Sequence, residues 1–361
     1  MTDPATTPVR DRMGFDEHAL AVWLGAILPD FGGALEIDQF SGGQSNPTYR
    51  LTSPQARYVL RRKPPGPLLK GAHDVLREAR VIAGLASTPV PVPPIMAVCD
   101  DPDVIGTPFF VMGLVEGRIF WDAAFSEIPR RERAAYFDAM NAAMAALHSV
   151  DQSAVGLADF GRTGNYFERQ IARWSGQYRD DTLAGRDADM DALVEWLPGA
   201  IPPGDEARIV HGDFRCDNVI FHPSRPEVIA ILDWELATIG HPLADFAYHA
   251  MMYRMPGDIV AGIGGLDPHE LGLPTESEYV AAYCTRTGRA NIPDWEFYIA
   301  FNLFRLAAIF HGIKGRVLRG NAVSARASEF AANFPRLASL AREAMDRCRA
   351  VPSLGQMGES A

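Results

Sequence analysis

The side chains best suited to do chemistry together in this sequence are Asp213, Asn218 and Asp233. Asn218 and Asp233 offer hard oxygen ligands, which suit a Mg²⁺ ion whose coordination is completed by water and phosphate. Asp213 lies on the loop that leads into the same region and offers a carboxylate that can accept a proton. One carboxylate for a proton and two groups for Mg²⁺ form the minimal set for phosphoryl transfer.

A predicted β-hairpin must position these groups. Two short apolar runs, 219–221 and 228–232, flank a Pro-rich polar turn, which is the pattern of a hairpin with a longer loop. Asn218 comes just before the first strand and Asp233 just after the second. Because the outer ends of a hairpin lie side by side, we expect these two side chains to meet. The alternative is a hairpin in which Asp and Asn only cap turns.

The stretch resembles the catalytic core of the protein-kinase-like fold, in which four residues separate the catalytic Asp from the Asn and a metal-binding Asp follows. The sequence His211-Gly-Asp is similar to that of the aminoglycoside phosphotransferase and choline kinase branch, which acts on small molecules. The resemblance implies an α+β, bilobal fold with a small β-rich N-lobe, containing one main helix, and a larger, mainly helical C-lobe. It also implies that Asp213 is catalytic, that Asn218 and Asp233 hold Mg²⁺, and that ATP is the donor.

Composition narrows the class of protein. The chain has 361 residues, 47% hydrophobic and 22% charged, which is typical of a packed protein with two domains or one bilobal unit. A net charge of −11 argues against a nucleic-acid partner. We find no apolar leader and no run of membrane-span length, so we expect a soluble, cytoplasmic protein without a membrane partner. The four cysteines lack metal-ligand spacing and are expected to be free thiols: Cys99, Cys216, Cys284 and Cys348.

Apolar periodicity divides the chain into two predicted lobes. We expect an N-lobe over 15–112, a hinge at 113–117 and a C-lobe over 118–349, with flexible tails at 1–14 and 350–361. The predicted N-lobe elements are helices at 15–28 and 73–86 and strands at 35–40, 48–52, 57–62, 95–99 and 108–112. The predicted C-lobe helices are 130–149, 165–179, 188–197, 243–254, 276–286, 294–318 and 324–348.

The loop 41–48 between two predicted strands is rich in small residues. Small residues let the backbone approach a phosphate, and exposed N–H groups can donate to it. By resemblance this is the nucleotide-covering loop, with Ser45 over the phosphates. A plain hairpin turn is the alternative.

The strand 57–62 and the helix 73–86 are predicted to carry an ion pair. Val59, Arg61 and Lys63 alternate along the strand and therefore share a face. Glu78 lies on the apolar stripe of the helix, where a carboxylate requires a cation, and Arg61 is the natural candidate. The resemblance assigns Arg61 to the phosphates, although the family normally has Lys there. Arg keeps the charge but differs from Lys in reach and geometry. A solvated basic strand end and a merely amphipathic helix remain the alternatives.

The segment 109–117 reads as a buried strand that runs into a Gly-containing linker. In the resembling family this linker is the hinge, whose backbone groups bind adenine. The resemblance places those groups at Gly113 and Val115, with Val59 above the ring and Ile220 below it.

Several polar residues around the motif are assigned structural roles. His148 ends a predicted helix, where it can satisfy the terminal carbonyls. His211 is expected to hold the catalytic loop by hydrogen bonds. By resemblance Asp245, in the first turn of a helix, anchors that loop. His241 stands where relatives commonly have Asp, in Gly-Asp-Pro.

Two basic and aromatic helical stretches, 165–174 and 304–316, bear on the substrate. They are similar to the kinase-like domains fused to acyl-CoA dehydrogenases in animals. Arg169, Arg173 and Arg305 would suit an anionic acceptor such as a hydroxy acid or its CoA thioester, unless they are only outer faces of helices. An aminoglycoside is a polycation and would require an acidic pocket instead. Glu235 is a candidate for the metal's outer shell or for the substrate.

Three functions are consistent with these residues. The first is an ATP- and Mg²⁺-dependent kinase for a small-molecule hydroxyl. The second is a nucleotide-binding pseudokinase module, which the Arg61 departure favours and the retention of all three motif residues disfavours. The third is a metal hydrolase, disfavoured because His211 has no His partner at ligand spacing.

Overall fold

The computed structural model describes residues 6–9, 13–29, 31–40, 46–66, 73–260, 262–322 and 326–350. The chain divides into two compact units. Unit 1 contains Met1–Phe120, Val150–Phe160 and Asp217–Ala237, and unit 2 contains Trp121–Ser149, Gly161–Cys216 and Thr238–Ala361. Within the described residues, no helix is both long and apolar enough to cross a bilayer.

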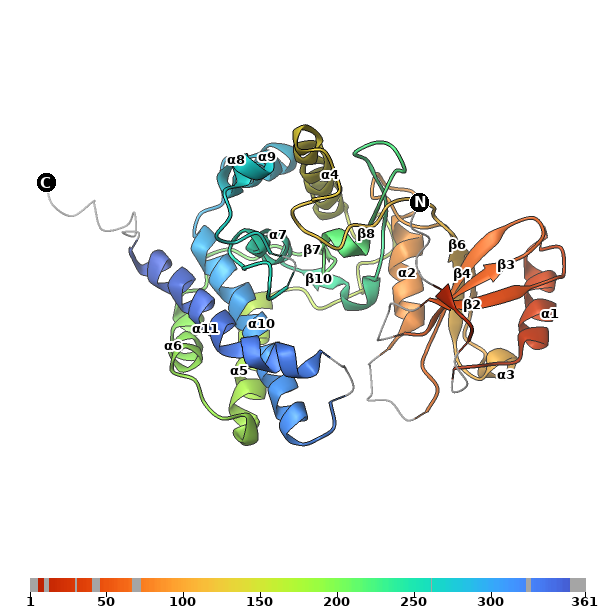
Figure 1. Ribbon diagram of the computed structural model, residues 1–361, viewed down its shortest axis with the longest axis horizontal. Helices are drawn as coiled ribbons and strands as arrows, with labels where there is room; N and C mark the ends of the chain where they lie inside the picture. Colours follow the sequence, from red (N-terminus) through yellow and green to blue (C-terminus); the bar gives the residue numbers. More distant parts are fainter. Residues whose placement is uncertain are drawn as a thin grey trace, which may run out of the picture. The chain divides into compact units, whose positions relative to one another are not determined.

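Unit 1 is built on a six-stranded antiparallel sheet (Figure 1) with the strand order β1-β2-β3-β4-β6-β5. Apolar and polar residues alternate in β3, as expected for a strand with one buried face, whereas most residues of β4 and β6 are buried. The strands are β1 (Thr6–Thr7), β2 (Glu36–Phe40), β3 (Thr48–Thr52), β4 (Arg57–Arg62), β5 (Ile95–Cys99) and β6 (Phe109–Gly113).

Helices of unit 1 cover both faces of this sheet (Figure 1). On one face α1 (Glu17–Ile27) and α3 (Pro102–Ile105) pack over Tyr58 and Leu60 of β4 in a common apolar core. On the other face lies α2 (Val75–Leu85), which contacts β5 and β6. Because side chains alternate along β4, Val59 and Arg61 face the α2 side.

The predicted hairpin is present as β8 (Val219–Phe221) and β9 (Val228–Ile231), flanked by the 3₁₀ turns η3 (Cys216–Asn218) and η4 (Trp234–Leu236). It belongs to unit 1, whereas we predicted it in the C-lobe. Arg77 of α2 joins two of the later segments, 150–160 and 217–237, to the rest of unit 1. It donates to the carbonyl oxygens of Phe160 and Ala237, and its guanidinium lies 3.7 Å from the Phe160 ring centroid.

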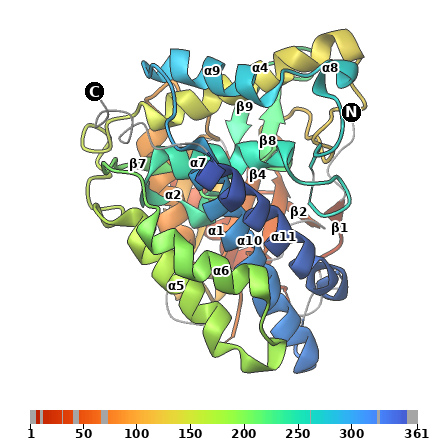
Figure 2. The same ribbon diagram turned by 90° about the vertical axis from the view of Figure 1, so that its left-hand side faces the viewer.

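Unit 2 is mainly helical (Figure 2), with a small antiparallel pair formed by β7 (Arg208–Val210) and β10 (Thr238–Gly240). Helix α10 is its centre, because α5, α7 and α11 all pack against it, while α4 packs on α9 and α6 on α11. The helices are α4 (Arg130–His148), α5 (Tyr166–Asp180), α6 (Ala188–Trp196), α7 (Pro242–Ala250), α8 (Pro268–Leu271), α9 (Glu276–Thr287), α10 (Trp295–Leu318) and α11 (Ala327–Ala350), with the 3₁₀ turns η1 (Thr182–Ala184), η2 (Leu197–Gly199) and η5 (Met251–Tyr253).

Each predicted helix and strand has a counterpart in the structure, with ends that differ by a few residues. The long prediction at 243–254 is divided into α7 and the 3₁₀ turn η5. Sequence patterns did not predict β1, α3, β7, β10 or α8. These elements have two to four residues, which is too short for a periodic pattern to emerge.

The linker after β6 fits tightly against the hairpin. Arg118 exchanges two backbone hydrogen bonds with Phe221, each 2.8 Å long. A Cβ atom at Gly117 would overlap with the carbonyl oxygen of Phe221 and with Cγ2 of Ile220. A glycine is therefore required here by close backbone approach.

We predict that Gly117→Ala destabilises the protein by about 2 kcal/mol, because β8 must move to accept the methyl group. The measurement is urea unfolding followed by circular dichroism. Gly176→Ala is the matched control, since nothing lies within 4 Å of a Cβ there and Ala favours a helix interior by about 0.5–1 kcal/mol. Equal stability of both variants would contradict the close approach.

Candidate active site

In unit 1, Arg61 lies among three carboxylates. Its Nε is 2.9 Å from Oε2 of Glu78, and its Nη2 is 2.6 Å from Oδ1 of Asp233 and 3.5 Å from Oε2 of Glu235. The predicted Arg61–Glu78 ion pair is therefore present. Arginine suits this position because its fork of N–H groups can address separate acceptors at once.

Burial makes this pairing necessary for Glu78. Its side chain is only 2% exposed, and that of Arg61 is 11% exposed. Burial raises the pKa of Glu78 to about 7, although the Arg61 charge opposes the shift. Burial alone would lower the pKa of Arg61, but Glu78 and Asp233 outweigh it and keep that pKa above its ordinary value. The positive charge of Arg61 therefore stabilises the ionised form of Glu78 against the cost of burial.

The two predicted metal ligands lie at neighbouring ends of the hairpin. The N–H of Leu232, the residue before Asp233, donates to the carbonyl oxygen of Asn218 over 2.8 Å. Asp233 has the left-handed conformation, with φ 63° and ψ 56°, which a non-glycine residue adopts at a cost and which occurs often at functional sites. An amide and a one-third exposed carboxylate form a donor set that fits Mg²⁺.

A polar contact that the sequence did not predict joins Glu235 to the region before β3. Nδ2 of Asn46 lies 3.5 Å from Oε2 of Glu235, and Oδ1 of Asn46 lies 3.1 Å from Nδ1 of His73. Asn46 is 1% exposed, and its position within the small-residue loop 41–48 was the one available signal. Ser45, predicted over the phosphates, lies outside the described residues.

At the predicted hinge, the backbone N–H of Gly113 is already engaged. Gly113 donates its N–H to the carbonyl oxygen of Pro94 over 2.9 Å, so of its two backbone groups the carbonyl is the better candidate for adenine. Pro94 itself has no N–H to offer in return. Val115 is partly exposed. Val59 and Ile220, predicted above and below the ring, are each 6% exposed.

In unit 2, helix α7 holds the loop that carries Asp213. Asp245 accepts the N–H of His211 on Oδ2 over 2.7 Å and the N–H of Gly212 on Oδ1 over 2.8 Å. Tyr248 donates its hydroxyl to Oδ1 of Asp213 over 2.5 Å. The N–H of Asp213 donates to Nδ1 of His211 over 3.2 Å. The predicted loop-holding contacts of Asp245 and His211 are therefore present.

A buried histidine completes the surroundings of Asp245. Nε2 of His148 lies 3.1 Å from Oδ2 of Asp245, and its Nδ1 lies 2.7 Å from the hydroxyl of Tyr283. Burial alone would raise the pKa of Asp245, but hydrogen bonds and charge from His148 and His211 hold it below its usual range. His148 was predicted to satisfy carbonyls at the end of its helix, but both of its ring nitrogens instead contact these side chains.

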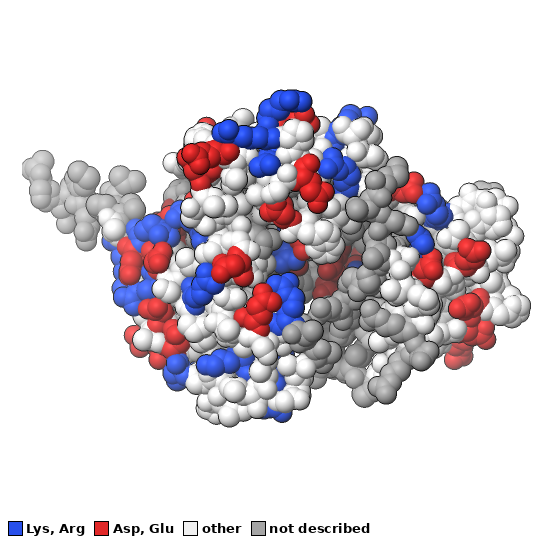
Figure 3. Space-filling model, in the orientation of Figure 1, with Lys and Arg blue, Asp and Glu red and all other residues white. Residues whose placement is uncertain are grey.

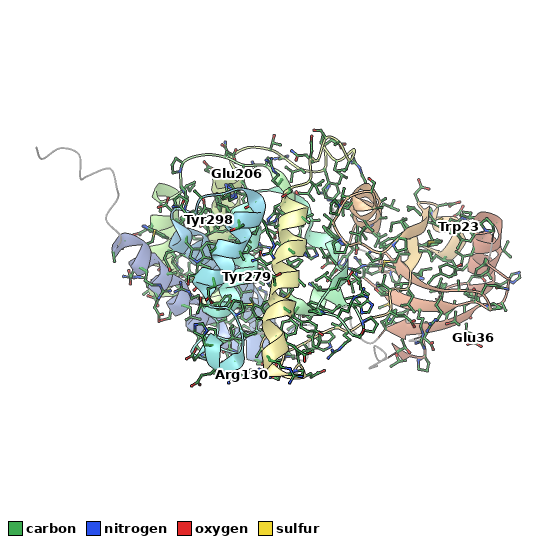
Figure 4. All side chains as sticks on the ribbon, turned by 90° about the horizontal axis from the view of Figure 1, so that it is seen from above. Trp23, Glu36, Arg130, Glu206, Tyr279 and Tyr298 are labelled. Carbon is green, nitrogen blue, oxygen red and sulfur yellow. The ribbon has the colours of Figure 1, made fainter. Side chains whose placement is uncertain are left out.

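His241 takes the position of a helix cap. It is the N-cap residue of α7, and its Nδ1 accepts the N–H of Leu243 over 3.3 Å. Burial lowers its pKa to about 4, so the ring is neutral at pH 7 and can accept a hydrogen bond. Its ring stacks on Tyr298 (labelled in Figure 4), with centroids 5.9 Å apart. The substitution of the usual Asp therefore preserves an acceptor for the helix N-terminus.

The three arginines predicted to contact substrate have different surroundings. Nη2 of Arg305 donates to the carbonyl oxygen of Gly212 over 3.2 Å, which places Arg305 beside the loop that carries Asp213. Nη2 of Arg169 donates to the carbonyl oxygen of Arg162 over 3.0 Å. Arg173 is exposed and lies over Trp174, 4.9 Å from the ring centroid. Of these three, Arg305 is the one that the structure brings to Asp213's loop.

The predicted motif crosses the boundary between the units. Asp213 belongs to unit 2, whereas Asn218 and Asp233 belong to unit 1. The structure therefore describes the Arg61–Asn218–Asp233 group and the Asp213 group each within its own unit.

Comparison with known proteins gives a consistent family. The model of the phosphotransferase enzyme family matches residues 36–301. Acyl-CoA dehydrogenase family member 10 of Mus musculus is 42% identical over 329 residues, covering 90% of this chain and 31% of that protein. Acyl-CoA dehydrogenase family member 11 of Gallus gallus is 42% identical over 339 residues, covering 91% and 43%. The chain spans less than half the length of these relatives.

Solved structures show the same fold. A protein of Ralstonia eutropha, provisionally named an aminoglycoside phosphotransferase, is 44% identical with a TM-score of 0.85, covering 92% of this chain and 99% of that chain. Aminoglycoside phosphotransferase APH(4)-Ia, solved with AMP-PNP and hygromycin B, is 15% identical with a TM-score of 0.57, covering 89% and 98%. At that identity the second likeness shows the fold alone. The predicted α+β, kinase-like fold is confirmed.

We predict that Arg61→Ala destabilises the protein by about 3 kcal/mol at a pH of about 8, because Glu78 loses its buried counter-charge. The loss is smaller at a pH of about 5.5. An acid whose folded pKa is raised binds more protons in the folded state, so its contribution to stability improves as pH falls through that pKa. For Glu78 the window extends from its ordinary value of 4.5 to about 7 in the intact protein and higher in the variant.

The measurement is thermal and denaturant unfolding at both pH values. Arg57→Ala is the control on the same strand, because Arg57 pairs with Glu116 at the surface, with side chains 49% and 56% exposed. We expect little change from it. A loss of stability in Arg61→Ala that does not depend on pH would contradict the role of Glu78.

Proposed function

Because the chain belongs to the phosphotransferase enzyme family, we propose that it transfers the γ-phosphoryl group of ATP to a hydroxyl group of a small molecule. The observation that carries this proposal is the ion pair of Arg61 with buried Glu78 beside Asp233. A cation fixed by a buried carboxylate next to a metal-binding carboxylate is the arrangement that kinases use for phosphates. The solved relative with bound AMP-PNP supports a nucleotide donor.

The proposed mechanism divides the work between the two groups of residues. Arg61, held by Glu78, binds the phosphates of the nucleotide. Asn218 and Asp233 would hold Mg²⁺, which when bound neutralises negative charge on the phosphates. Asp213 accepts a hydrogen bond from the acceptor hydroxyl and takes its proton late, as the new P–O bond forms. A weak base suffices because the transition state is loose, so that orientation and electrostatics contribute most of the acceleration.

For the acceptor we propose a hydroxy acid or a hydroxyacyl-CoA. The relatives named as acyl-CoA dehydrogenase family members support this class, since their longer chains carry the matching segment. Arg305, beside the catalytic loop, supplies a positive charge for an anionic group. The contribution of Arg169 and Arg173 is proposed on charge alone.

An aminoglycoside is the second candidate acceptor, favoured by the name of the Ralstonia eutropha relative. A polycation requires a concentrated acidic surface. On the face shown in Figure 3, the acidic and basic side chains that are coloured lie interspersed. This distribution offers no support for a polycationic acceptor on that face.

The experiment that tests the function is a phosphorylation screen with Mg²⁺ and ATP, read by mass spectrometry. The acceptors are hydroxy acids, hydroxyacyl-CoAs, amino alcohols and aminoglycosides. A mass increase in one acceptor class identifies the substrate. Slow ATP hydrolysis in Mg²⁺ that Asp233→Asn abolishes would support the enzyme, whereas ATP binding without hydrolysis or transfer would favour a nucleotide-binding module instead.

We predict that Asp213→Ala lowers kcat by about 10²–10⁴-fold, while ATP affinity remains nearly unchanged because the proposed mechanism places Asp213 at the acceptor hydroxyl. Steady-state kinetics and calorimetric ATP titration measure the two quantities. Asp346→Ala is the control, since that exposed carboxylate on α11 pairs with its helix neighbour Arg342. Normal turnover by Asp213→Ala would remove Asp213 from the mechanism.

A further inference from the structure

Tyr248 makes a short side-chain contact with Asp213. Its hydroxyl donates to Oδ1 of Asp213 over 2.5 Å, from the last turn of α7. The tyrosine is 8% exposed, so its ring packs in the interior while its hydroxyl reaches the loop. Nε of Arg215 lies 3.9 Å from the same carboxylate oxygen, which makes the tyrosine the closer of these two partners.

Burial keeps the Tyr248 hydroxyl protonated, so that the tyrosine is the donor and Asp213 the acceptor. It raises the pKa of the Tyr248 phenol well above its ordinary value, and the negative charge of Asp213 raises it further. The phenol is therefore protonated throughout the range in which an enzyme works, and it donates to the carboxylate. A hydrogen bond to a charged acceptor of this kind is stronger than one between neutral groups.

A second cation strengthens this donor. Cζ of Arg305 lies 5.2 Å from the centroid of the Tyr248 ring, within the range of a cation–π contact. A positive charge over the ring draws electron density from the phenol and makes its hydroxyl a better donor. The same guanidinium donates from Nη2 to the carbonyl oxygen of Gly212, while its buried Nε makes no hydrogen bond within the described part of the chain. Arg305 thus contacts both the tyrosine and the loop.

The contacts along α7 follow the loop residue by residue. Asp245 binds the N–H groups of His211 and Gly212, and Tyr248, one helical turn later, binds the side chain of Asp213. His249 follows, with its ring centroid 5.2 Å from that of Phe214. Residues three and four apart share a helix face. One face of α7 therefore addresses consecutive positions of the loop.

We propose that Tyr248 is a positioning residue for Asp213: its hydrogen bond fixes the rotation of the carboxylate, so that the acceptor hydroxyl meets the base in one orientation. The inference rests on the proposed function, in which Asp213 receives the acceptor's proton. Orientation matters here because positioning of the reacting groups, rather than strong basicity, accelerates phosphoryl transfer.

The test is Tyr248→Phe, which keeps the packed ring and removes the donor. We expect kcat to fall by about ten- to a hundredfold, with KM for MgATP unchanged. We also expect the acid limb of the kcat/KM–pH profile to move up by about one pH unit, because the anionic base loses a donor. Arg215 and Arg305 stay charged over this range, and His211 is common to both proteins, so none of them explains a difference between the profiles.

Tyr253→Phe is the matched control. Tyr253 is also buried, in the 3₁₀ turn η5 that follows α7, but its hydroxyl donates to the carbonyl oxygen of Pro274. It should lose stability without a change in the pH profile. A Tyr248→Phe enzyme that matched this control in kcat and in pH profile would overturn the proposal.

A double-mutant cycle separates action through Asp213 from a general structural effect. In an Asp213→Ala background, Tyr248→Phe should cause no further loss of the residual activity. The same fold-loss in both backgrounds would overturn the proposal.

An activity-independent measurement separates this proposal from the proposed function. The ¹³C carboxyl signal of Asp213, assigned by its loss in Asp213→Asn, should titrate about one pH unit higher in Tyr248→Phe than in the unmodified protein. An unchanged titration midpoint would overturn the Tyr248 proposal even for an active kinase. Failure of every acceptor, or normal turnover by Asp213→Ala with an acceptor that is phosphorylated, would instead overturn the proposed function.

Discussion

The loop that carries Asp213 depends on the hydrogen bonds of one buried carboxylate, that of Asp245. A carboxylate 4% exposed requires donors in fixed positions, because an unpaired charge in the interior is costly. Two backbone N–H groups of the loop and the ring of His148 supply them. The loop is thereby tied to α7, and the same helix face can present Tyr248 to Asp213. The geometry of the proposed base therefore follows from how one buried charge is satisfied.

Unit 1 meets the same constraint with a cationic side chain. Glu78 is buried on α2 and requires a cation, which Arg61 supplies from β4. The remaining N–H groups of that guanidinium then face Asp233 at the end of the hairpin. One buried acid thus brings together a helix, a strand of the sheet and the hairpin. Both units build their functional groups around a buried carboxylate whose partners come from elsewhere in the sequence.

Local patterns determined how much could be predicted from the sequence. The hairpin and the facing of Arg61 and Glu78 were predictable, because strand and helix periodicity fix which side chains share a face. The Tyr248–Asp213 contact was not, since it spans 35 positions and depends on how α7 packs on the loop. Its one signal was the spacing of Asp245 and Tyr248 on a helix face. The paired three-residue strands β7 and β10 directly precede that loop and α7, yet they carry no periodic pattern.

The two departures from the family pattern are explained by the geometry of the substituted groups. A lysine at position 61 would offer one compact ammonium, whereas Arg61 reaches Glu78 through Nε and Asp233 through Nη2 at the same time. Its fork therefore orders the helix and the hairpin end together. His241 replaces a charged helix cap with a neutral one, because burial lowers its pKa to about 4 while Nδ1 still accepts the N–H of Leu243. Arg61 thus supplies the paired cation that β4 requires, and His241 supplies the acceptor that the start of α7 requires.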